Sequence, residues 1–253
     1  MAEHDDWDTH WERYAAAASR NPAQQMRHAL IVRLLTQEPG AAPMRLLDLG
    51  SGQGDLLAQV RARLPAASLL GFELSARGVE ISRTKVPAAA FLVADLFSPP
   101  PELTGYREWA THAVCSEVLE HVDAPADFLR AARPCLADGA RFIVTVPGGP
   151  MSAFDRHIGH RQHFTRESIS RVLRDGGFEV ERVYLSGFPF FNLYRCVVIA
   201  RGEKLAADVD HGGSGVSAAL AGATMAAFRG LFRLNLTNSP FGWQVVAVAR
   251  KQA

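Results

Sequence analysis

The sequence predicts a doubly wound α/β domain with a mostly parallel seven-stranded sheet. Short apolar runs alternate with helical patterns along the chain, which is the layout of a parallel sheet with helices on both faces. The runs are mostly continuous, as expected of strands that are buried on both faces. A length of 253 residues, with 48% hydrophobic and 21% charged residues, allows a sizeable core. We therefore expect a single domain over residues 1–253.

The expected elements follow one another in a regular order. Strands are predicted at Arg45–Leu49, Ser68–Glu73, Ala89–Val93, His112–Cys115, Arg141–Val146, Phe178–Leu185 and Trp243–Ala249. Helices are predicted at Asp55–Leu64, Ser75–Lys85, Ala124–Cys135, Thr165–Asp175, Phe190–Ala207 and Val216–Leu234, after a helical stretch from Trp7 to Leu35. Ser75 and Asp123 are candidate N-cap residues. The domain then consists of a helical cap (1–40), a core (41–185), a helical insertion (186–240) and a last strand (241–253).

Charge and cysteine content argue against several classes of protein. Lys and Arg number 27 against 26 acidic residues, so the net charge of +1 gives no general reason to expect a nucleic-acid partner. Cys115, Cys135 and Cys196 show neither metal-type pairing nor a disulfide framework, which favours the cytoplasm. The N-terminus lacks an apolar export segment, and the apolar runs fall short of the ~18–20 residues that cross a bilayer. We expect a soluble chain without a transmembrane segment.

A glycine-rich turn follows the first predicted strand. The strand ends in Asp48 and Leu49, and the turn contains Gly50, Gly52 and Gly54 before a helix begins. Glycines at alternate positions allow a sharp bend and a close approach to a ligand. The N–H groups at the start of the helix add a partial positive charge. The turn therefore predicts a ligand site at the carboxyl end of the strand.

Acidic residues follow the next three strands. Glu73 ends the second strand, Asp95 follows the third, and Ser116 and Glu117 follow the fourth. A carboxylate about 20 residues after the glycine turn can accept hydrogen bonds from both ribose hydroxyls. Parallel strands deliver these side chains to one edge of the sheet, so we expect a nucleoside site there.

Two nucleoside ligands fit such an edge. A dinucleotide site requires the spacing G-x-G-x-x-G/A, but this chain has Asp55 at the third small-residue position and Gly54 one residue early. An acid at the start of the helix would repel a pyrophosphate and tolerate a cationic sulfonium. The spacing favours the sulfonium ligand.

Taken together, these motifs resemble the class I S-adenosylmethionine-dependent methyltransferases. The residues that carry the resemblance are Asp48-x-Gly50-x-Gly52-x-Gly54, Glu73, Asp95 and the run Ser116-Glu117-Val118-Leu119-Glu120-His121-Val122. The similarity extends in order from Arg45 to Leu185 and includes the last strand. It is greatest to the small-molecule branch that includes the ubiquinone-biosynthesis methyltransferases, and it implies a Rossmann-like methyltransferase fold.

The resemblance implies a role for each cofactor-binding residue. It assigns Asp48, Gly50, Ser51, Gly52 and Gly54 to the loop that contacts the methionyl part of S-adenosylmethionine. It assigns Glu73 to the ribose hydroxyls and Asp95 to the adenine amino group, with Leu74 and Leu96 on either side of the adenine ring.

The same resemblance implies roles on the substrate side and in the cap. Ser116 and Glu117 would face the substrate beside the cofactor. Tyr14 or Arg27 of the helical cap would hold the cofactor carboxylate, although both can equally pack the cap. The product cofactor would be S-adenosylhomocysteine.

Methyl transfer from a sulfonium is an in-line displacement that depends mainly on positioning in a dry pocket. An oxygen or nitrogen nucleophile also needs a base. His121, His157, His160 and His163 are candidates, since they follow the fourth and fifth strands. We favour His160 or His163; the alternative is a polar loop that caps the next helix. The acceptor is expected to be a small organic molecule, methylated at oxygen in preference to nitrogen.

A divalent metal is a further interpretation of the same region. Glu117, Glu120 and His121 have i, i+3, i+4 spacing, so on a helical turn they would share a face, and His163 or His160 could complete a four-ligand set. This set resembles the metal site of plant small-RNA 2′-O-methyltransferases, and Mg²⁺ could acidify a substrate oxygen there. The same residues occur in metal-independent relatives, where the acids cap the helix. We favour the absence of a metal.

The insertion begins with an aromatic run from Phe188 to Tyr194. It is interpreted as a substrate pocket or lid, as core or a homodimer contact, or as a membrane-surface patch. Two further functions remain open for the whole chain: an NAD(P)-dependent oxidoreductase and a non-catalytic S-adenosylmethionine-binding regulatory protein.

Overall fold

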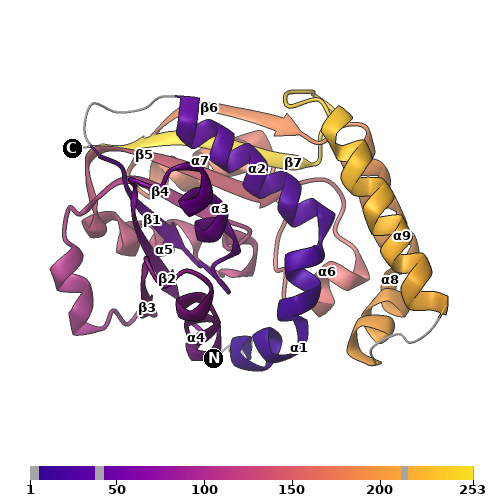
Figure 1. Ribbon diagram of the computed structural model, residues 1–253. Coiled ribbons are helices and arrows are strands. Elements are labelled where there is room, and N and C mark those ends of the chain that lie inside the picture. The colour runs from indigo at the N-terminus through magenta and orange to yellow at the C-terminus, as the bar shows by residue number, and fades with distance from the viewer. Residues whose placement is uncertain (1–5, 38–42, 212–215, 253) are drawn as a thin grey trace.

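The computed structural model describes residues 6–37, 43–211 and 216–252, without the side chains of 13–17 and 203–221. Its helices are α1 (Trp7–Arg20), α2 (Pro22–Gln37), α3 (Asp55–Arg63), α4 (Ala76–Lys85), α5 (Pro125–Ala132), α6 (Ala153–His157), α7 (Arg166–Asp175), α8 (Phe190–His211) and α9 (Val216–Leu231) (Figure 1). Its strands are β1 (Arg45–Leu49), β2 (Ser68–Glu73), β3 (Ala90–Val93), β4 (Ala110–Ser116), β5 (Leu136–Pro147), β6 (Phe178–Ser186) and β7 (Gln244–Lys251). Short 3₁₀ helices lie at Pro101–Tyr106, Leu119–His121, Arg133–Cys135 and Phe232–Leu234.

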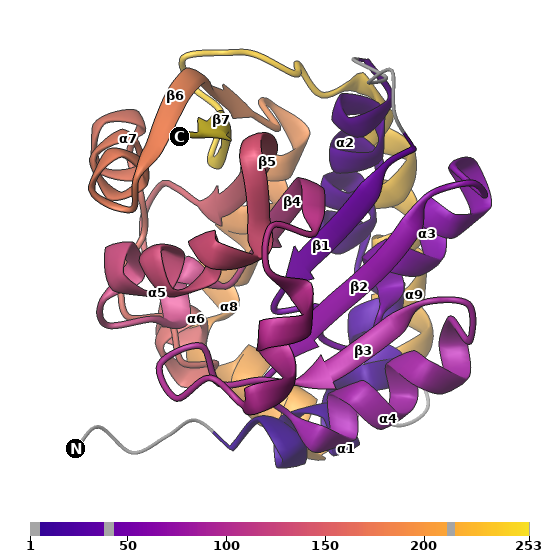
Figure 2. The same cartoon turned by 90° about the vertical axis from the view of Figure 1, so that its left-hand side faces the viewer.

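The strands form one seven-stranded sheet in the order β3-β2-β1-β4-β5-β7-β6. Strands β1 to β5 pair in parallel, and β7 pairs antiparallel with both β5 and β6. Figure 2 shows β5, β4, β1, β2 and β3 in succession across the sheet. The predicted fold class, a doubly wound and mostly parallel sheet of the Rossmann-like methyltransferase type, is confirmed.

Two apolar clusters cover the two faces of the sheet, as continuous strand runs require. On one face, α2, α3 and α4 bury Leu34, Leu57 and Val79 against the sheet. On the other face, α5 and α7 bury Leu129 and Ile169. The sheet is therefore rigid on both sides, and its loops can hold side chains in fixed positions.

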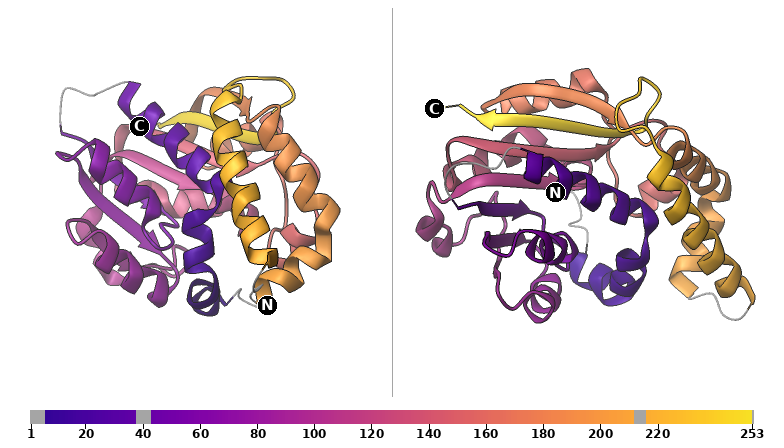
Figure 3. Two further views of the ribbon diagram at one scale, coloured as in Figure 1. Left: turned by 45° about the vertical axis from the view of Figure 1, so that its right-hand side comes forward. Right: turned by 45° about the horizontal axis from the view of Figure 1, so that its top comes forward.

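The carboxyl ends of β1, β2, β3, β4 and β5 meet at one edge of the sheet, which is where ligands bind in this class of fold. Helices α1 and α6 lie at this edge, and α8 and α9 lie side by side at one end of the molecule (Figures 1 and 3). The helices before β1 and between β6 and β7 thus surround this edge of the sheet. Among the described residues, none of the helices is sufficiently long and apolar to span a bilayer.

Prolines shift two of the expected helix boundaries. The stretch from Trp7 to Leu35 is two helices, because the residue before Pro22 is disfavoured in the α region and Asn21 adopts an extended ψ of 118°. The helix expected over Ala124–Cys135 ends at Ala132 and continues as a 3₁₀ turn that contains Pro134.

The two predicted N-caps had different outcomes. Ser75 caps α4 and accepts a hydrogen bond from the Gly78 N–H at 2.9 Å, as predicted. The prediction for Asp123 is wrong, because the N-cap of α5 is Ala124, which makes no side-chain cap bond. The Asp123 carboxylate pairs instead with Arg161 at 2.6 Å. This ion pair ties the loop after β4 to the histidine segment after α6.

Candidate active site

The glycine turn after β1 has the backbone that the sequence predicted. Gly50 and Gly52 have φ of 73° and 54°, in the left-handed region that favours glycine. A Cβ on Gly50 would lie 2.4 Å from Val118, and a Cβ on Gly52 would lie 2.7 Å from the ring of Trp11. The turn therefore leaves no space for side chains at these positions and brings the backbone close to its neighbours.

Glu73 supports this turn from the end of β2. Its carboxylate accepts hydrogen bonds from the N–H groups of Gly52 at 2.7 Å and Ser75 at 3.0 Å. Burial raises the pKa of Glu73, while these two N–H groups act in the opposite direction. The carboxylate is thus fixed beside the glycine turn, where the sequence predicted it.

Helix α1 lies over the turn and over Glu73. The Trp11 ring packs on Gly52 and within 3.0 Å of where a Cβ on Gly78 would lie. Asp8 anchors the helix to α4, since its carboxylate accepts hydrogen bonds from the Ser75 hydroxyl at 2.5 Å and the Arg77 N–H at 3.1 Å. The indole of Trp11 consequently covers the predicted ribose-binding side of the edge.

A cavity of about 380 Å³ lies beside the glycine turn, a volume typical of sites for small ligands. The predicted site residues that line it are Arg27, Asp48, Gly50, Ser51, Gly52, Ser116, Glu117, Glu120, His121 and His160. Residues from α1, α2, α6, α8 and α9 complete the wall, among them Trp11, Asp155, Arg195 and Met225. One continuous cavity therefore joins the predicted cofactor turn to two of the predicted histidines.

Other predicted site residues lie outside this lining. Gly54 packs against Ser82 of α4, and Asp95 accepts a hydrogen bond from the Phe97 N–H at 2.9 Å. Leu96 is buried in the core, whereas Leu74 is 41% exposed. Glu73 and His163 are also not among the residues that line the cavity. Tyr14 belongs to α1, and its side chain is outside the part of the chain that the structure describes.

Glu117 does not share a helical face with Glu120 and His121, contrary to the expectation. The segment Leu119–His121 is a 3₁₀ turn, and Glu117 has a φ of 57°, so its side chain leaves in another direction. Gln244 donates a hydrogen bond to Glu117 at 2.9 Å, and Arg27 Nε lies 3.6 Å from its other oxygen. Arg27 Nε is buried and has no hydrogen-bond partner among the described residues, so this guanidinium can receive an anionic group from the cavity.

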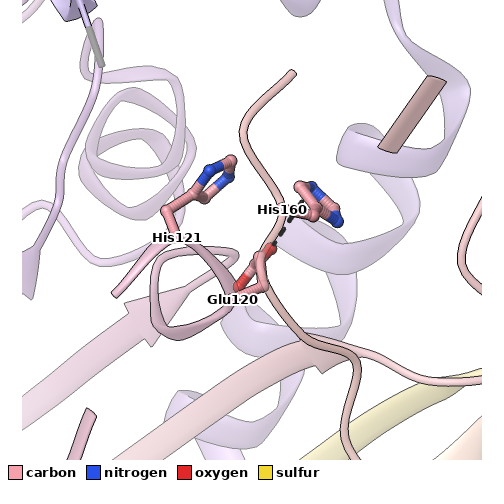
Figure 4. A group of neighbouring side chains, drawn as sticks. All are labelled: Glu120, His121 and His160. Atoms are coloured by element: carbon pink, nitrogen blue, oxygen red, sulfur yellow. Dashed lines mark ion pairs between the residues drawn. The ribbon is translucent and has the colours of Figure 1, made fainter. Parts of the chain in front are cut away.

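Glu120, His121 and His160 form a compact group at the far end of the cavity (Figure 4). Their nearest ligand-type atoms all lie within 4.8 Å of one another. Glu120 is completely buried, and neither of its oxygens has a hydrogen-bond partner within the described chain. His160 Nε2 lies 4.0 Å from a Glu120 oxygen. A buried carboxylate without partners is costly, so it marks a place where a proton, a cation or a ligand donor is needed.

Burial controls the charge of this group. It raises the pKa of Glu120 well above its usual range, and the charge of Glu117 adds to the effect. It lowers the pKa of His121 to about 4 and that of His160 to about 3. Both histidines are therefore neutral at physiological pH and have a lone pair available for a proton or a cation.

Asp155 is a functional candidate that the sequence analysis missed. Arg195 of α8 binds both of its oxygens, at 2.9 and 2.7 Å, and Ser152 closes a capping box with it at the start of α6. Arg195 and the hydrogen bonds from Ser152 outweigh burial and lower the pKa of Asp155 to about 2. The Ser152-x-x-Asp155 spacing was the available signal, because it is typical of a helix start.

A family model described as a methyltransferase domain matches residues 18–183, well over half of the chain. The chain belongs to this methyltransferase family. The match, the fold and the motifs together place this methyltransferase domain in the class I S-adenosylmethionine-dependent superfamily, as the sequence indicated.

Relatives of this methyltransferase domain differ in their named reactions. It is 33% identical over 118 residues to trans-aconitate 2-methyltransferase of Methylobacterium nodulans, which covers 45% of this chain and 42% of that protein. It is 31% identical over 96 residues to ubiquinone biosynthesis O-methyltransferase of Roseobacter denitrificans, covering 38% of each. The aligned segments thus span less than half the length of these two relatives.

A solved structure has the same fold over nearly the whole chain. Phosphoethanolamine N-methyltransferase 2 of Haemonchus contortus, in complex with S-adenosyl-L-methionine, aligns with 99% of this methyltransferase domain and 61% of its own chain. The TM-score is 0.64 and the sequence identity is 14%. At that identity the likeness concerns the fold alone.

Proposed function

We propose that this chain transfers a methyl group from S-adenosylmethionine to an oxygen of a small organic acceptor. The observation that carries the proposal is the single cavity that runs from the glycine turn to the neutral histidines 121 and 160. The bound cofactor supplies an activated methyl group whose leaving group is already a sulfonium. The chain itself then has to hold the acceptor oxygen in line, exclude water and accept a proton.

The donors around the cavity fit a zwitterionic adenosyl cofactor. The glycine turn offers a close backbone approach, and the guanidinium of Arg27, whose Nε makes no hydrogen bond within the described residues, can bind the cofactor carboxylate. Glu73 can accept the ribose hydroxyls once Trp11 moves off it, and Asp95, Leu74 and Leu96 remain the proposed adenine contacts. Ser116 lies at the end of β4, where the methyl group would face the acceptor.

The oxidoreductase alternative is supported less well. Asp55 begins α3 at the place where a dinucleotide pyrophosphate would need free N–H groups. Its carboxylate already pairs with Lys85 at 2.6 Å and accepts a hydrogen bond from Ser19 at 2.9 Å. A non-catalytic, S-adenosylmethionine-binding regulatory protein would retain the cofactor donors, so turnover has to separate it from an enzyme.

The first test measures cofactor binding by calorimetry and thermal shift. We expect binding of S-adenosylhomocysteine but not of NAD(P), and an affinity at least tenfold lower for Glu73→Ala, because two ribose hydrogen bonds are lost. Glu102→Gln, at an exposed glutamate of a 3₁₀ turn, is the control and should bind like the parent. Equal affinity in Glu73→Ala would remove Glu73 from the site, and preference for NAD(P) would overturn the assignment.

The acceptor is best explored among small acids and phenols. Relatives of the chain are named trans-aconitate 2-methyltransferase and ubiquinone biosynthesis O-methyltransferase, and these names favour an oxygen acceptor of this kind. Radiolabelled S-adenosylmethionine with panels of carboxylic acids, phenols and amines tests whether oxygen is preferred. We propose a small-molecule partner and no nucleic acid. A homodimer is a separate proposal, which light scattering would support by giving twice the mass of one chain.

A divalent metal is a second candidate, supported by the unpartnered Glu120. Glu120, His121 and His160 would hold the ion, and it would supply Lewis acidity toward an acceptor oxygen. Of the two histidines proposed to complete the set, His163 and His160, the described residues group His160 with Glu120 and His121, and Glu117 is engaged by Gln244. A carboxylate and two imidazoles suit several divalent ions, including Mn²⁺.

The metal test uses Mn²⁺ with a readout independent of turnover. We expect electron paramagnetic resonance to detect bound Mn²⁺, Glu120→Gln to weaken binding at least tenfold, and Glu102→Gln to have no effect. EDTA should then abolish turnover, and Mn²⁺ should restore it. Full turnover in EDTA, with no bound Mn²⁺, would leave the histidines as bases only.

A further inference from the structure

His160 and His163 form a hydrogen-bonded pair that ends on a backbone carbonyl. His163 Nδ1 lies 3.0 Å from the carbonyl oxygen of Gly149. His160 Nδ1 lies 3.2 Å from His163 Nε2. Both side chains are nearly enclosed, with 9% of His160 and 7% of His163 exposed. Water therefore has little access to these nitrogens.

The carbonyl determines where each proton lies. A carbonyl oxygen can only accept, so His163 Nδ1 must carry the hydrogen. In a neutral imidazole the other nitrogen is then an acceptor, so His163 Nε2 receives the hydrogen of His160 Nδ1. His160 Nε2 is left without a hydrogen, and this nitrogen is the one that lies 4.0 Å from Glu120.

Asp155 is a group that could have favoured the opposite tautomer of His163, with the hydrogen on Nε2. A proton on His163 Nε2 would need an acceptor, and Asp155 Oδ2 lies 3.8 Å away, beyond hydrogen-bond distance. Both oxygens of Asp155 are bound by Arg195, and Oδ2 also accepts from Ser152. Asp155 is consequently occupied, and the chain of hydrogen bonds from Gly149 is undisturbed.

The Gly149 carbonyl, on which this chain of hydrogen bonds ends, is held in a fixed position. Gly149 has a φ of 71°, and a Cβ there would lie 2.7 Å from the Trp243 ring. The residue is held between β5 and β7, because the adjacent Gly148 N–H donates to the Trp243 carbonyl at 2.8 Å. The carbonyl of Gly149 therefore has a fixed direction toward His163.

We propose that His163 is a positioning residue that holds His160 in its Nδ1–H tautomer and so presents a bare Nε2 to the cavity. The proposal rests on the proposed function, because there this bare nitrogen either takes the proton of the molecule that is methylated or binds the divalent metal ion. It distinguishes two histidines that the sequence left equivalent. His160 acts on the substrate side, and His163 acts through His160.

The tautomers can be read directly by two-bond ¹H–¹⁵N correlation spectra of the full chain with labelled histidines at neutral pH. We expect the Nδ1–H pattern for both His160 and His163. The spectrum of the unmodified chain is sufficient for this test, so it does not depend on any variant folding. An Nε2–H pattern for His160 would overturn the proposal.

Variants test the dependence of His160 on His163. His163→Gln keeps an acceptor near the position of Nε2, whereas His163→Leu removes it. We expect His163→Leu to change the His160 pattern and to lower kcat about ten- to hundredfold with an unchanged KM for the cofactor, and His163→Gln to restore most of both. Glu102→Gln, at an exposed glutamate of a 3₁₀ turn far from the histidines in sequence, is the control and should change neither.

The outcomes separate this proposal from the proposed function. An unchanged His160 pattern in His163→Leu would overturn the positioning role, and so would a His163→Gln variant as slow as His163→Leu. Absence of turnover with every acceptor would contradict the proposed function, while the tautomer of His160 would still be decided by the spectra.

Discussion

Single buried carboxyl groups determine much of the electrostatics of this edge. Asp48 is 2% exposed at the end of β1, and burial together with the charge of Glu73 raises its pKa to about 7. Burial also raises the pKa of Glu73 and Glu120. Three acidic groups that cost stability when ionised thus lie near one edge of the sheet, and two of them, Asp48 and Glu120, line the cavity, which is expected of a functional site.

The pH dependence of stability tests Asp48. In the unfolded chain Asp48 loses its proton near pH 4, while in the folded chain it keeps it until about pH 7. The contribution of Asp48 to the free energy of unfolding therefore falls as pH rises from about 4 to 7, by up to about 4 kcal/mol for a pKa shift of this size. Above pH 7 this contribution falls no further. We expect Asp48→Asn to remove this loss in urea unfolding at a series of pH values.

The control for this measurement is Glu102→Gln, which changes an exposed glutamate and should leave the pH dependence intact. A fall in stability between pH 4 and 7 that is as steep in Asp48→Asn as in the parent would contradict the raised pKa of Asp48.

Among the elements, α1 covers the edge that is proposed to bind the cofactor. Trp11 packs on Gly52, and Trp7 lies edge-on to His121 with ring centroids 4.9 Å apart. One helix therefore contacts both the glycine turn and the histidine group. Asp8 holds it on α4. A ribose can reach Glu73 only if this helix, or the Trp11 side chain, moves.

Tryptophan fluorescence reports that movement. We expect S-adenosylhomocysteine to change the emission of the chain, because Trp11 leaves its half-buried position on Gly52. Trp11→Phe should lose most of the change. Trp109→Phe should keep it, since Trp109 packs beside Tyr106 in the core cluster that α5 and α7 cover. Binding by calorimetry without any change in emission would mean that Trp11 stays in place.

In the molecule as a whole, the last strand, β7, brings a residue from the end of the chain to the site. β7 enters the sheet between β5 and β6 and pairs antiparallel with both. Gln244, its first residue, thereby reaches Glu117, 127 positions earlier in the chain. Arg195 of α8 likewise reaches Asp155 of α6. Segments that are distant in sequence thus fix Glu117 and Asp155, two acidic groups that line the cavity.

The sequence by itself determined the alternation of strands and helices, the sharp glycine turn after the first strand and the acids at successive strand ends. These features depend on local backbone geometry and on the spacing of apolar residues along each strand or helix. Both are set by residues that are close together in the sequence. Even there, Pro22 and Pro134 moved helix boundaries that the apolar pattern alone did not mark.

Only the tertiary structure decided which groups face one another across the cavity. Glu117, Glu120 and His121 were expected on one face, but a left-handed residue and a 3₁₀ turn separated them. The spacing of His160 and His163 could not show that a Gly149 carbonyl orients one of them toward the other. Such contacts join residues from different loops, and their geometry is fixed by packing rather than by sequence separation.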